Sequence, residues 1–113
     1  MNIEQEEKIN AEIRRLNRIF NKIDKNKKAV VLPLIETAAF YRVTLRELEV
    51  VLNQEGYVEQ YKNGENQFGM KKRPEADLHI AISKNLTSII KQLTDLVPAE
   101  ERKKSRLEAL ENG

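Results

Sequence analysis

The sequence contains no cysteine, no tryptophan and one histidine. Without cysteine the chain forms no disulfide, no thiolate zinc site and no cysteine nucleophile. A single histidine excludes a metal site that needs two histidines from one chain. No run of about 18 apolar residues occurs, which excludes a membrane-spanning helix. The N-terminal residues lack the apolar stretch of a signal peptide, so secretion is not expected.

Aromatic residues are also scarce, at 5% of 113 residues, whereas charged residues make up 34%. A chain of this length forms one domain, or at most one domain with an arm, and buries only about two thirds of its unfolded surface. Leucine, isoleucine and valine must therefore provide most of a thin core. Such a composition is typical of a helical protein with long solvated faces, or of one that completes its core by self-association.

The net charge of +2 is distributed unevenly along the chain. Residues 1–28 carry eight basic and five acidic side chains, and residues 57–74 carry four basic and two acidic ones. The segments 29–56 and 75–113 are mildly acidic. The two basic segments are therefore the parts of the chain that an anionic partner would contact.

Apolar residues in the first segment recur at steps of four and three, which predicts a basic amphipathic helix over residues 1–28. The helix is expected to end near residues 24–28. Its stripe is too short for an isolated coiled coil, so we expect it to pack against another helix or another subunit. The stripe consists of Ile9, Ile13, Leu16, Phe20 and Ile23.

Two further helices are expected before residue 56. Apolar spacing predicts the first over residues 29–41, where Pro33 either opens the helix or kinks it. Thr44 and Glu47 form a capping-box pattern, which predicts that the second helix begins at Thr44 and runs to about residue 55. Gly56 is suited to end it.

The connection over residues 38–44 is a candidate helix-turn-helix, because it joins the two expected helices by a tight turn. Arg46 lies near the start of the second helix, but Glu47, Glu49 and Glu55 make that helix acidic. An acidic helix is poorly suited to the major groove. The pattern therefore favours two helices packed as a hairpin over a DNA-reading motif.

The region after Gly56 loses the helical period. Asn63-Gly64 is the typical two-residue turn of a β-hairpin, which predicts a short hairpin or ordered loop over residues 57–73. Pro74 opens a long helix over residues 74–97 that Pro98 ends. We therefore expect a mainly α fold: a helical core over residues 29–98, followed by a charged helix or frayed tail over residues 99–113.

Nine cations are candidates for contact with DNA phosphates, because clustered cations release counterions from the duplex. Three of them also precede the N-terminus of the long helix, which favours anions. A solvated helix face and a solubilising loop explain the same residues without DNA. The nine are Arg14, Arg15, Arg18, Lys22 and Lys25 in the first helix, and Lys62, Lys71, Lys72 and Arg73 around the hairpin.

His79 lies near Glu75 and Asp77, a combination that can bind a metal or act as a base. No second ligand, nucleophile or glycine-rich phosphate loop accompanies it at a suitable spacing. A surface or partly buried histidine is the favoured interpretation. We therefore expect no catalytic site, no metal and no cofactor.

The order of several motifs resembles the small subunit of phage terminases, the small proteins encoded beside the DNA-packaging ATPase. The resemblance covers roughly residues 10–107. It implies an N-terminal helix, a short helical pair, an Asn-Gly loop and a long helix opened by proline. The motifs are Tyr61-Lys62-Asn63-Gly64-Glu65-Asn66-Gln67, a basic run, Pro74, Leu96-Val97-Pro98 and Ser105-Arg106-Leu107.

The resemblance also implies a function. Terminase small subunits are not enzymes; they assemble as rings, bind double-stranded viral DNA and stimulate the large subunit, which carries the ATPase and nuclease sites. A phage or prophage protein of this kind works in the cytoplasm of an infected or lysogenic bacterium. Two alternatives stay open: a dimeric helix-turn-helix regulator, and a virion structural or adaptor protein without DNA contact.

Self-association of such a protein is expected to use its longest apolar stripes. These lie in the first helix and in the long helix after Pro74. The residues expected to serve packing and assembly are Ile9, Ile13, Leu16, Phe20, Ile82, Leu86, Ile89 and Leu93.

Overall fold

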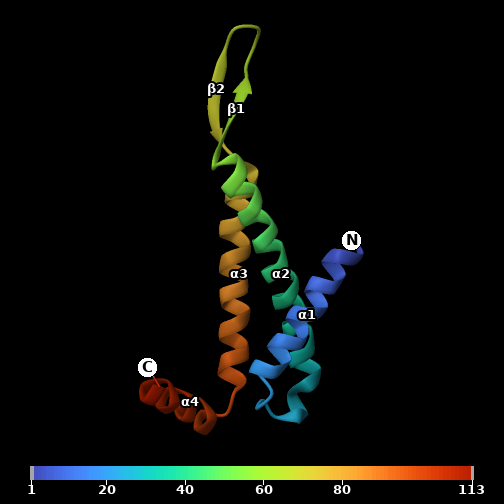
Figure 1. Ribbon diagram of the computed structural model, residues 1–113, viewed down its shortest axis with the longest axis vertical. Coiled ribbons are helices and arrows are strands. Elements are labelled where there is room, and N and C mark those ends of the chain that lie inside the picture. The colour runs from blue at the N-terminus through green and yellow to red at the C-terminus, as the bar shows by residue number, and fades with distance from the viewer. Residues whose placement is uncertain (1, 113) are drawn as a thin grey trace.

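Two long antiparallel helices form the centre of the computed structural model, which describes residues 2–112 (Figure 1). A third helix packs along the first of the pair, and a β-hairpin extends from one end to give a slender molecule of 65 × 34 × 21 Å. The mainly α fold with a short hairpin is therefore confirmed. In chain order the elements are α1 (Ile3–Ile19), the 3-10 helix η1 (Lys25–Lys27), α2 (Lys28–Glu55), β1 (Val58–Lys62), β2 (Phe68–Lys72), α3 (Pro74–Leu96) and α4 (Ala99–Asn112).

Helix α1 is shorter than the sequence predicts. The side chain of Asn2 caps its start by accepting a hydrogen bond from the backbone of Gln5 (2.7 Å). It ends at Ile19, not near residues 24–28. The following turn carries Ile23 into the core, and the Asp24 carboxylate accepts from a backbone N–H that a continuing helix would use. Such local bonding by aspartate competes with helix propagation.

Helix α2 is one continuous helix, so the predicted break at Thr44 is wrong, and with it the tight turn of a helix-turn-helix. Pro33 lies inside the helix, in its second turn. Buried Leu45 and Leu48 continue the stripe begun by Ile35, and no glycine or proline interrupts residues 34–55. Packing of this long apolar face favours continuation of the helix.

Glu47 shows why the capping-box interpretation of Thr44 fails. Both of its carboxylate oxygens accept from the side-chain amide of Gln5, each at 2.9 Å. The carboxylate therefore connects α2 to the start of α1 instead of reaching back to Thr44. Helix α2 ends where expected, at Gly56, which has a φ of +82° and donates its N–H to the Leu52 carbonyl.

The β-hairpin forms as expected, with a longer loop. Strands β1 and β2 pair antiparallel, with Gln60 opposite Met70. Five residues, 63–67, connect them, and the N–H of Asn63 donates to the carbonyl of Gln67 at 2.7 Å. Gly64 supplies a positive φ of +95° within this loop. Asn63-Gly64 therefore marks the turn but does not form a two-residue turn by itself.

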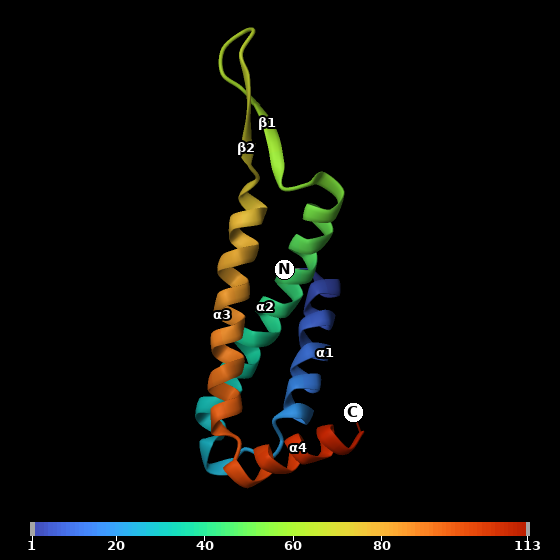
Figure 2. The ribbon, with the colours of Figure 1, turned by 90° about the vertical axis from the view of Figure 1, so that its left-hand side faces the viewer.

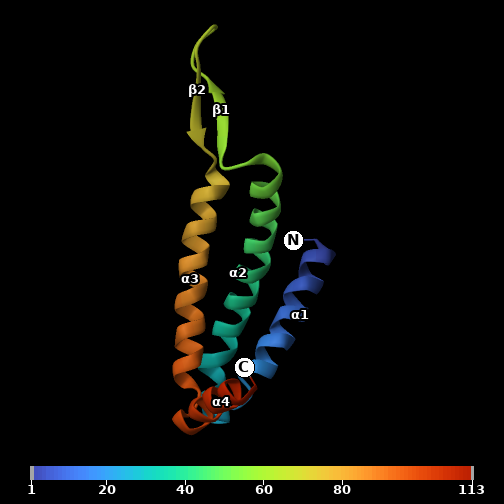
Figure 3. The same cartoon turned by 60° about the vertical axis from the view of Figure 1, so that its left-hand side comes forward.

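Helix α3 begins with Pro74 at its first turn, as the sequence predicts, and ends at Leu96, one residue before the predicted end. The segment after Pro98 forms α4, a helix that crosses the end of the molecule opposite the hairpin (Figures 2 and 3). Its apolar residues Leu107 and Leu110 are exposed. Helix α4 therefore adds little to the core.

The core lies between α1, α2 and α3. Leu93 and Ile35 are almost fully buried at its centre. The stripe of α1 finds its partner in α2 of the same chain. Any assembly surface must therefore draw on other residues as well. Of the side chains expected to serve packing and assembly, Leu16, Phe20, Ile82, Leu86 and Leu93 are buried in this core, and Ile9, Ile13 and Ile89 are half-buried against it.

Candidate nucleic-acid interface

Exposed cations gather around the C-terminal half of α1 and the η1 turn. Within residues 2–112, no carboxylate lies within 4.0 Å of their side-chain nitrogens. We call this set the lower basic surface. It consists of Arg14, Arg18, Lys22, Lys25, Lys27 and Lys28.

The fold explains why these side chains face solvent. Helix α1 packs its buried Leu16 against α2, and residues two positions to either side of it point away from that contact. Arg14 and Arg18 are therefore one turn apart on the solvent face, about 6 Å apart along the axis by helix geometry. Asp24, the acid nearest in sequence, uses its carboxylate to cap η1.

Arg15 is predicted from the sequence to join this surface, but it is engaged elsewhere. Its guanidinium forms two hydrogen bonds to the carboxylate of Glu12 on the same helix. The hydrogen bond to Glu12 raises the pKa of Arg15. The pair is locally neutral, so Arg15 contributes little net charge to the lower basic surface.

The cations of the hairpin are mostly paired as well. Glu59 of β1 forms ion pairs with Lys71 (3.4 Å) and Arg73 (3.3 Å). Lys72 pairs with Asp77 in the first turn of α3 at 2.9 Å. Of the four hairpin cations predicted to bind phosphate, Lys62 alone has no carboxylate within 4.0 Å in the described part of the chain. The hairpin therefore presents a weaker anion site than the sequence indicates.

The two predicted groups of cations are not brought together. The hairpin projects from one end of the molecule, whereas η1 lies at the other end (Figure 1). The lower end also receives α4, whose cations sequence reasoning did not assign to a site. Lys27 and Lys28 could have been found from the sequence, because they continue the run of cations that begins before them. The cations of α4 could not, because the position of α4 depends on tertiary structure. The α4 cations are Arg102, Lys103, Lys104 and Arg106.

The hairpin has two unlike faces. On one face the ring of Tyr61 covers Gly69, and the Lys71 ammonium lies 6.0 Å from the centre of that ring. The opposite face carries Val58, Phe68 and Met70, with exposed fractions of 49%, 60% and 65%. One face is therefore closed by its own contacts, and the other exposes three apolar side chains.

His79 takes part in a polar contact between α3 and α2. Its Nε2 lies 3.2 Å from one carboxylate oxygen of Glu49, and Arg46 donates to the other at 2.9 Å. The hydrogen bond from His79, followed by that from Arg46, lowers the pKa of Glu49. Asp77, two positions before His79 in the sequence, pairs with Lys72 and not with His79. This cluster connects two helices of the core.

Comparison with known proteins provides no relative. No protein-family model matches the chain, and neither a curated protein nor a solved structure matches it. No helix among residues 2–112 is both long and apolar enough to cross a membrane.

Proposed function

We propose that this protein is a non-catalytic, DNA-binding subunit of the terminase small-subunit type, which holds viral DNA and regulates the large ATPase and nuclease subunit during genome packaging. The observation that carries the proposal is the lower basic surface. Six exposed cations, with no acidic partner among residues 2–112, are concentrated at one end of a slender helical molecule.

The lower basic surface suits the DNA backbone more than base edges. Cations such as Arg14 and Lys22 gain affinity by displacing condensed counterions, a contribution that depends on salt and not on sequence. We therefore expect weak, salt-sensitive binding to duplex DNA.

Self-association is the second part of the proposal. The exposed face of the hairpin, with Val58, Phe68 and Met70, has no partner within the described chain. Among residues 2–112 nothing pairs with the outer edges of the two-stranded sheet, and such edges favour pairing with another chain. Several copies side by side would multiply the lower basic surface, so weak phosphate contacts would add up to useful avidity. A ring is the arrangement that the family resemblance implies.

The resemblance supports the identity of the partner. Its motifs fall on β1 and the hairpin loop, on the proline that opens α3, on the junction between α3 and α4, and on the middle of α4. The short helical pair that the resemblance implies is replaced here by the continuous α2. The proposed protein partner is the large terminase subunit, and the proposed setting is the cytoplasm of a phage-infected or lysogenic bacterium.

Native mass spectrometry of the protein at tens of micromolar, with and without a short DNA duplex, tests both parts. We expect a closed oligomer that binds duplex at low salt. The ATPase rate of the large subunit encoded by the same phage or prophage should then rise when the protein is added. A monomer that binds no duplex contradicts the proposal, and an oligomer without salt-dependent DNA binding would favour a virion structural protein instead.

A further inference from the structure

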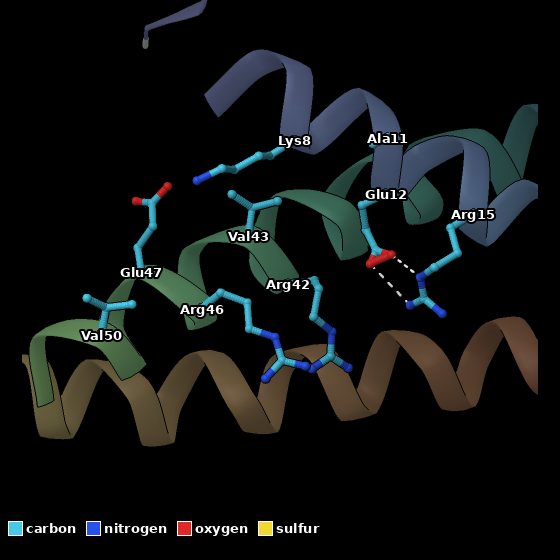
Figure 4. A pocket seen from close by; sticks show the side chains of 9 residues that line it. All are labelled: Lys8, Ala11, Glu12, Arg15, Arg42, Val43, Arg46, Glu47 and Val50. Carbon is cyan, nitrogen blue, oxygen red and sulfur yellow. Dashed lines mark hydrogen bonds and ion pairs between the residues drawn. The ribbon is translucent and has the colours of Figure 1, made fainter. Parts of the chain in front are cut away.

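A groove separate from the lower basic surface lies between α1 and α2 (Figure 4). Its volume is about 730 Å³. Ala11, Val43 and Val50 give it an apolar component, and its charged residues include four cations and two carboxylates. The charged residues are Lys8, Glu12 and Arg15 from α1, and Arg42, Arg46 and Glu47 from α2.

Both carboxylates of the groove are already engaged. Glu12 accepts two hydrogen bonds from Arg15, and Glu47 accepts two from the Gln5 amide. The cations are less well matched. The partner of Lys8 is Glu4, an exposed side chain 3.6 Å away. Arg42 has no carboxylate within 4.0 Å among residues 2–112. Lys8, Arg15 and Arg46 each have a carboxylate partner, so Arg42 is the groove cation left without one in the described part of the chain.

Arg42 and Arg46 are one helical turn apart on α2, and their guanidinium groups turn toward each other (Figure 4). Like charges at this spacing repel each other. Glu49 pairs with Arg46 but contacts it from the side of His79, outside the groove. An anion that bridges the two guanidinium groups would relieve this repulsion.

We propose that the groove binds a phosphate ester, whose phosphoryl group lies between Arg42 and Arg46. Planar guanidinium groups bind phosphate oxygens in pairs, and two of them in succession select a phosphoryl group over a monovalent ion. The organic part of the ester would lie along Val50, an exposed apolar side chain of the groove. On the opposite helix, Arg15 and Lys8 are already paired with Glu12 and Glu4.

The phosphoryl group in the groove could belong to one of two ligands: the backbone of DNA or a free nucleotide. The first source rests on the proposed function, because it requires that the protein bind DNA; the second does not. The binding of a mononucleotide can therefore succeed or fail independently of DNA packaging. Lys84, an exposed cation on α3 that does not line the groove, provides a control of equal charge.

The test is an NMR titration of the ¹⁵N-labelled full chain, which follows backbone and arginine Nε–Hε signals. The added probes are inorganic phosphate, deoxyadenosine monophosphate and a short DNA duplex. We expect saturable shifts at residues 42–50 with the first two probes. Arg42→Gln and Arg46→Gln should each weaken mononucleotide binding about tenfold, the effect of losing one charged hydrogen bond, whereas Lys84→Gln should leave it unchanged.

The duplex distinguishes the two sources. If it competes with the mononucleotide and Arg42→Gln weakens both, the phosphate comes from DNA. If Arg42→Gln weakens the mononucleotide alone, the ligand is a free phosphate ester. Absence of saturable shifts at residues 42–50 overturns the proposal, as does an equal loss of mononucleotide affinity on Lys84→Gln. Arg42→Lys provides a second variant that keeps the charge but not the planar fork, and we expect it to bind more weakly than the wild type.

Discussion

The ring of Tyr61 lies directly over Gly69, its partner across the hairpin, so closely that a Cβ at Gly69 would come within 2.6 Å of the ring. The glycine is therefore not needed for its backbone freedom, since its φ is not positive. It is needed for space. An aromatic ring covering a cross-strand glycine stabilises this one face of an otherwise exposed two-stranded sheet.

The contact between Tyr61 and Gly69 predicts that Gly69→Ala changes hairpin stability in opposite directions with and without the Tyr61 ring. Gly69→Ala should destabilise the hairpin by about 1 kcal/mol, because the Tyr61 ring must move aside. In a Tyr61→Ala background the same change should be neutral or stabilising, since glycine is unfavourable in a strand. Hydrogen exchange of the hairpin amides measures both effects. The same loss of protection in both backgrounds would show that the ring does not require the glycine.

The continuity of α2 predicts the effect of Thr44→Ala. Replacing the N-cap residue of a helix by alanine lowers the free energy of unfolding by about 1 kcal/mol. Thr44 lies inside α2, where alanine is the better helix former, so we expect a free energy of unfolding that is unchanged or slightly increased. Urea denaturation provides the measurement. A loss near the capping value would mean that α2 breaks at Thr44.

The burial of Leu93 in the core of one chain predicts that Leu93→Ala lowers the free energy of unfolding strongly. Leu93 is 0% exposed, so its truncation should cost about 2–5 kcal/mol. Leu107→Ala on α4 removes the same atoms from a half-exposed side chain and provides the control, for which we expect a much smaller loss. Both values come from urea denaturation. Similar losses for the two variants would contradict the position of the core.

The contact between Glu49 and His79 predicts a pH-dependent contribution to stability. Because the folded-state pKa of Glu49 is lowered, its contribution is present above the ordinary pKa of a glutamate and is lost as the pH falls through the lowered value. The carboxylate is partly exposed, so the contribution is at most about 1 kcal/mol. Glu49→Gln should therefore destabilise the protein near neutral pH.

Thermal unfolding over a pH series measures this contribution, with Glu55→Gln as the control on an exposed carboxylate of the same helix. The difference between wild type and Glu49→Gln should shrink below about pH 4, as the carboxylate becomes protonated. A difference that persists unchanged in acid, or an equal effect of Glu55→Gln, would show that the ion pair is not the cause.

Local signals in the sequence predict the hairpin end of the fold well. Gly56, Gly64 and Pro74 each act within a few residues, through positive φ or the missing N–H of proline, and each takes its expected place. The predicted break at Thr44 is wrong because its pattern with Glu47 also fits a helix interior. The group that Glu47 accepts from instead, the side-chain amide of Gln5, is 42 positions away in the sequence.

Prediction of the candidate nucleic-acid interface from the sequence is limited in the same way, by contacts between distant residues. The sequence reveals which residues are cationic, but pairing depends on register and tertiary contacts. Lys71 is neutralised because Glu59 stands directly opposite it across the hairpin. Arg42 and Arg46 have a visible helical spacing, but the wall of their groove belongs to α1, whose position the sequence does not provide.

Binding of duplex DNA across a salt series tests the central claim most directly. The wild type is compared with Arg14→Gln/Arg18→Gln/Lys22→Gln and with Lys62→Gln/Lys71→Gln/Lys72→Gln, which removes as many charges from the hairpin. We predict that the first variant binds at least about tenfold more weakly at low salt, with a slope of log K against log salt that is flatter by about 0.9 for each phosphate that the variant no longer neutralises. The hairpin variant should stay close to the wild type. Absence of salt-dependent binding by the wild type, or equal losses of affinity in both variants, would contradict the account.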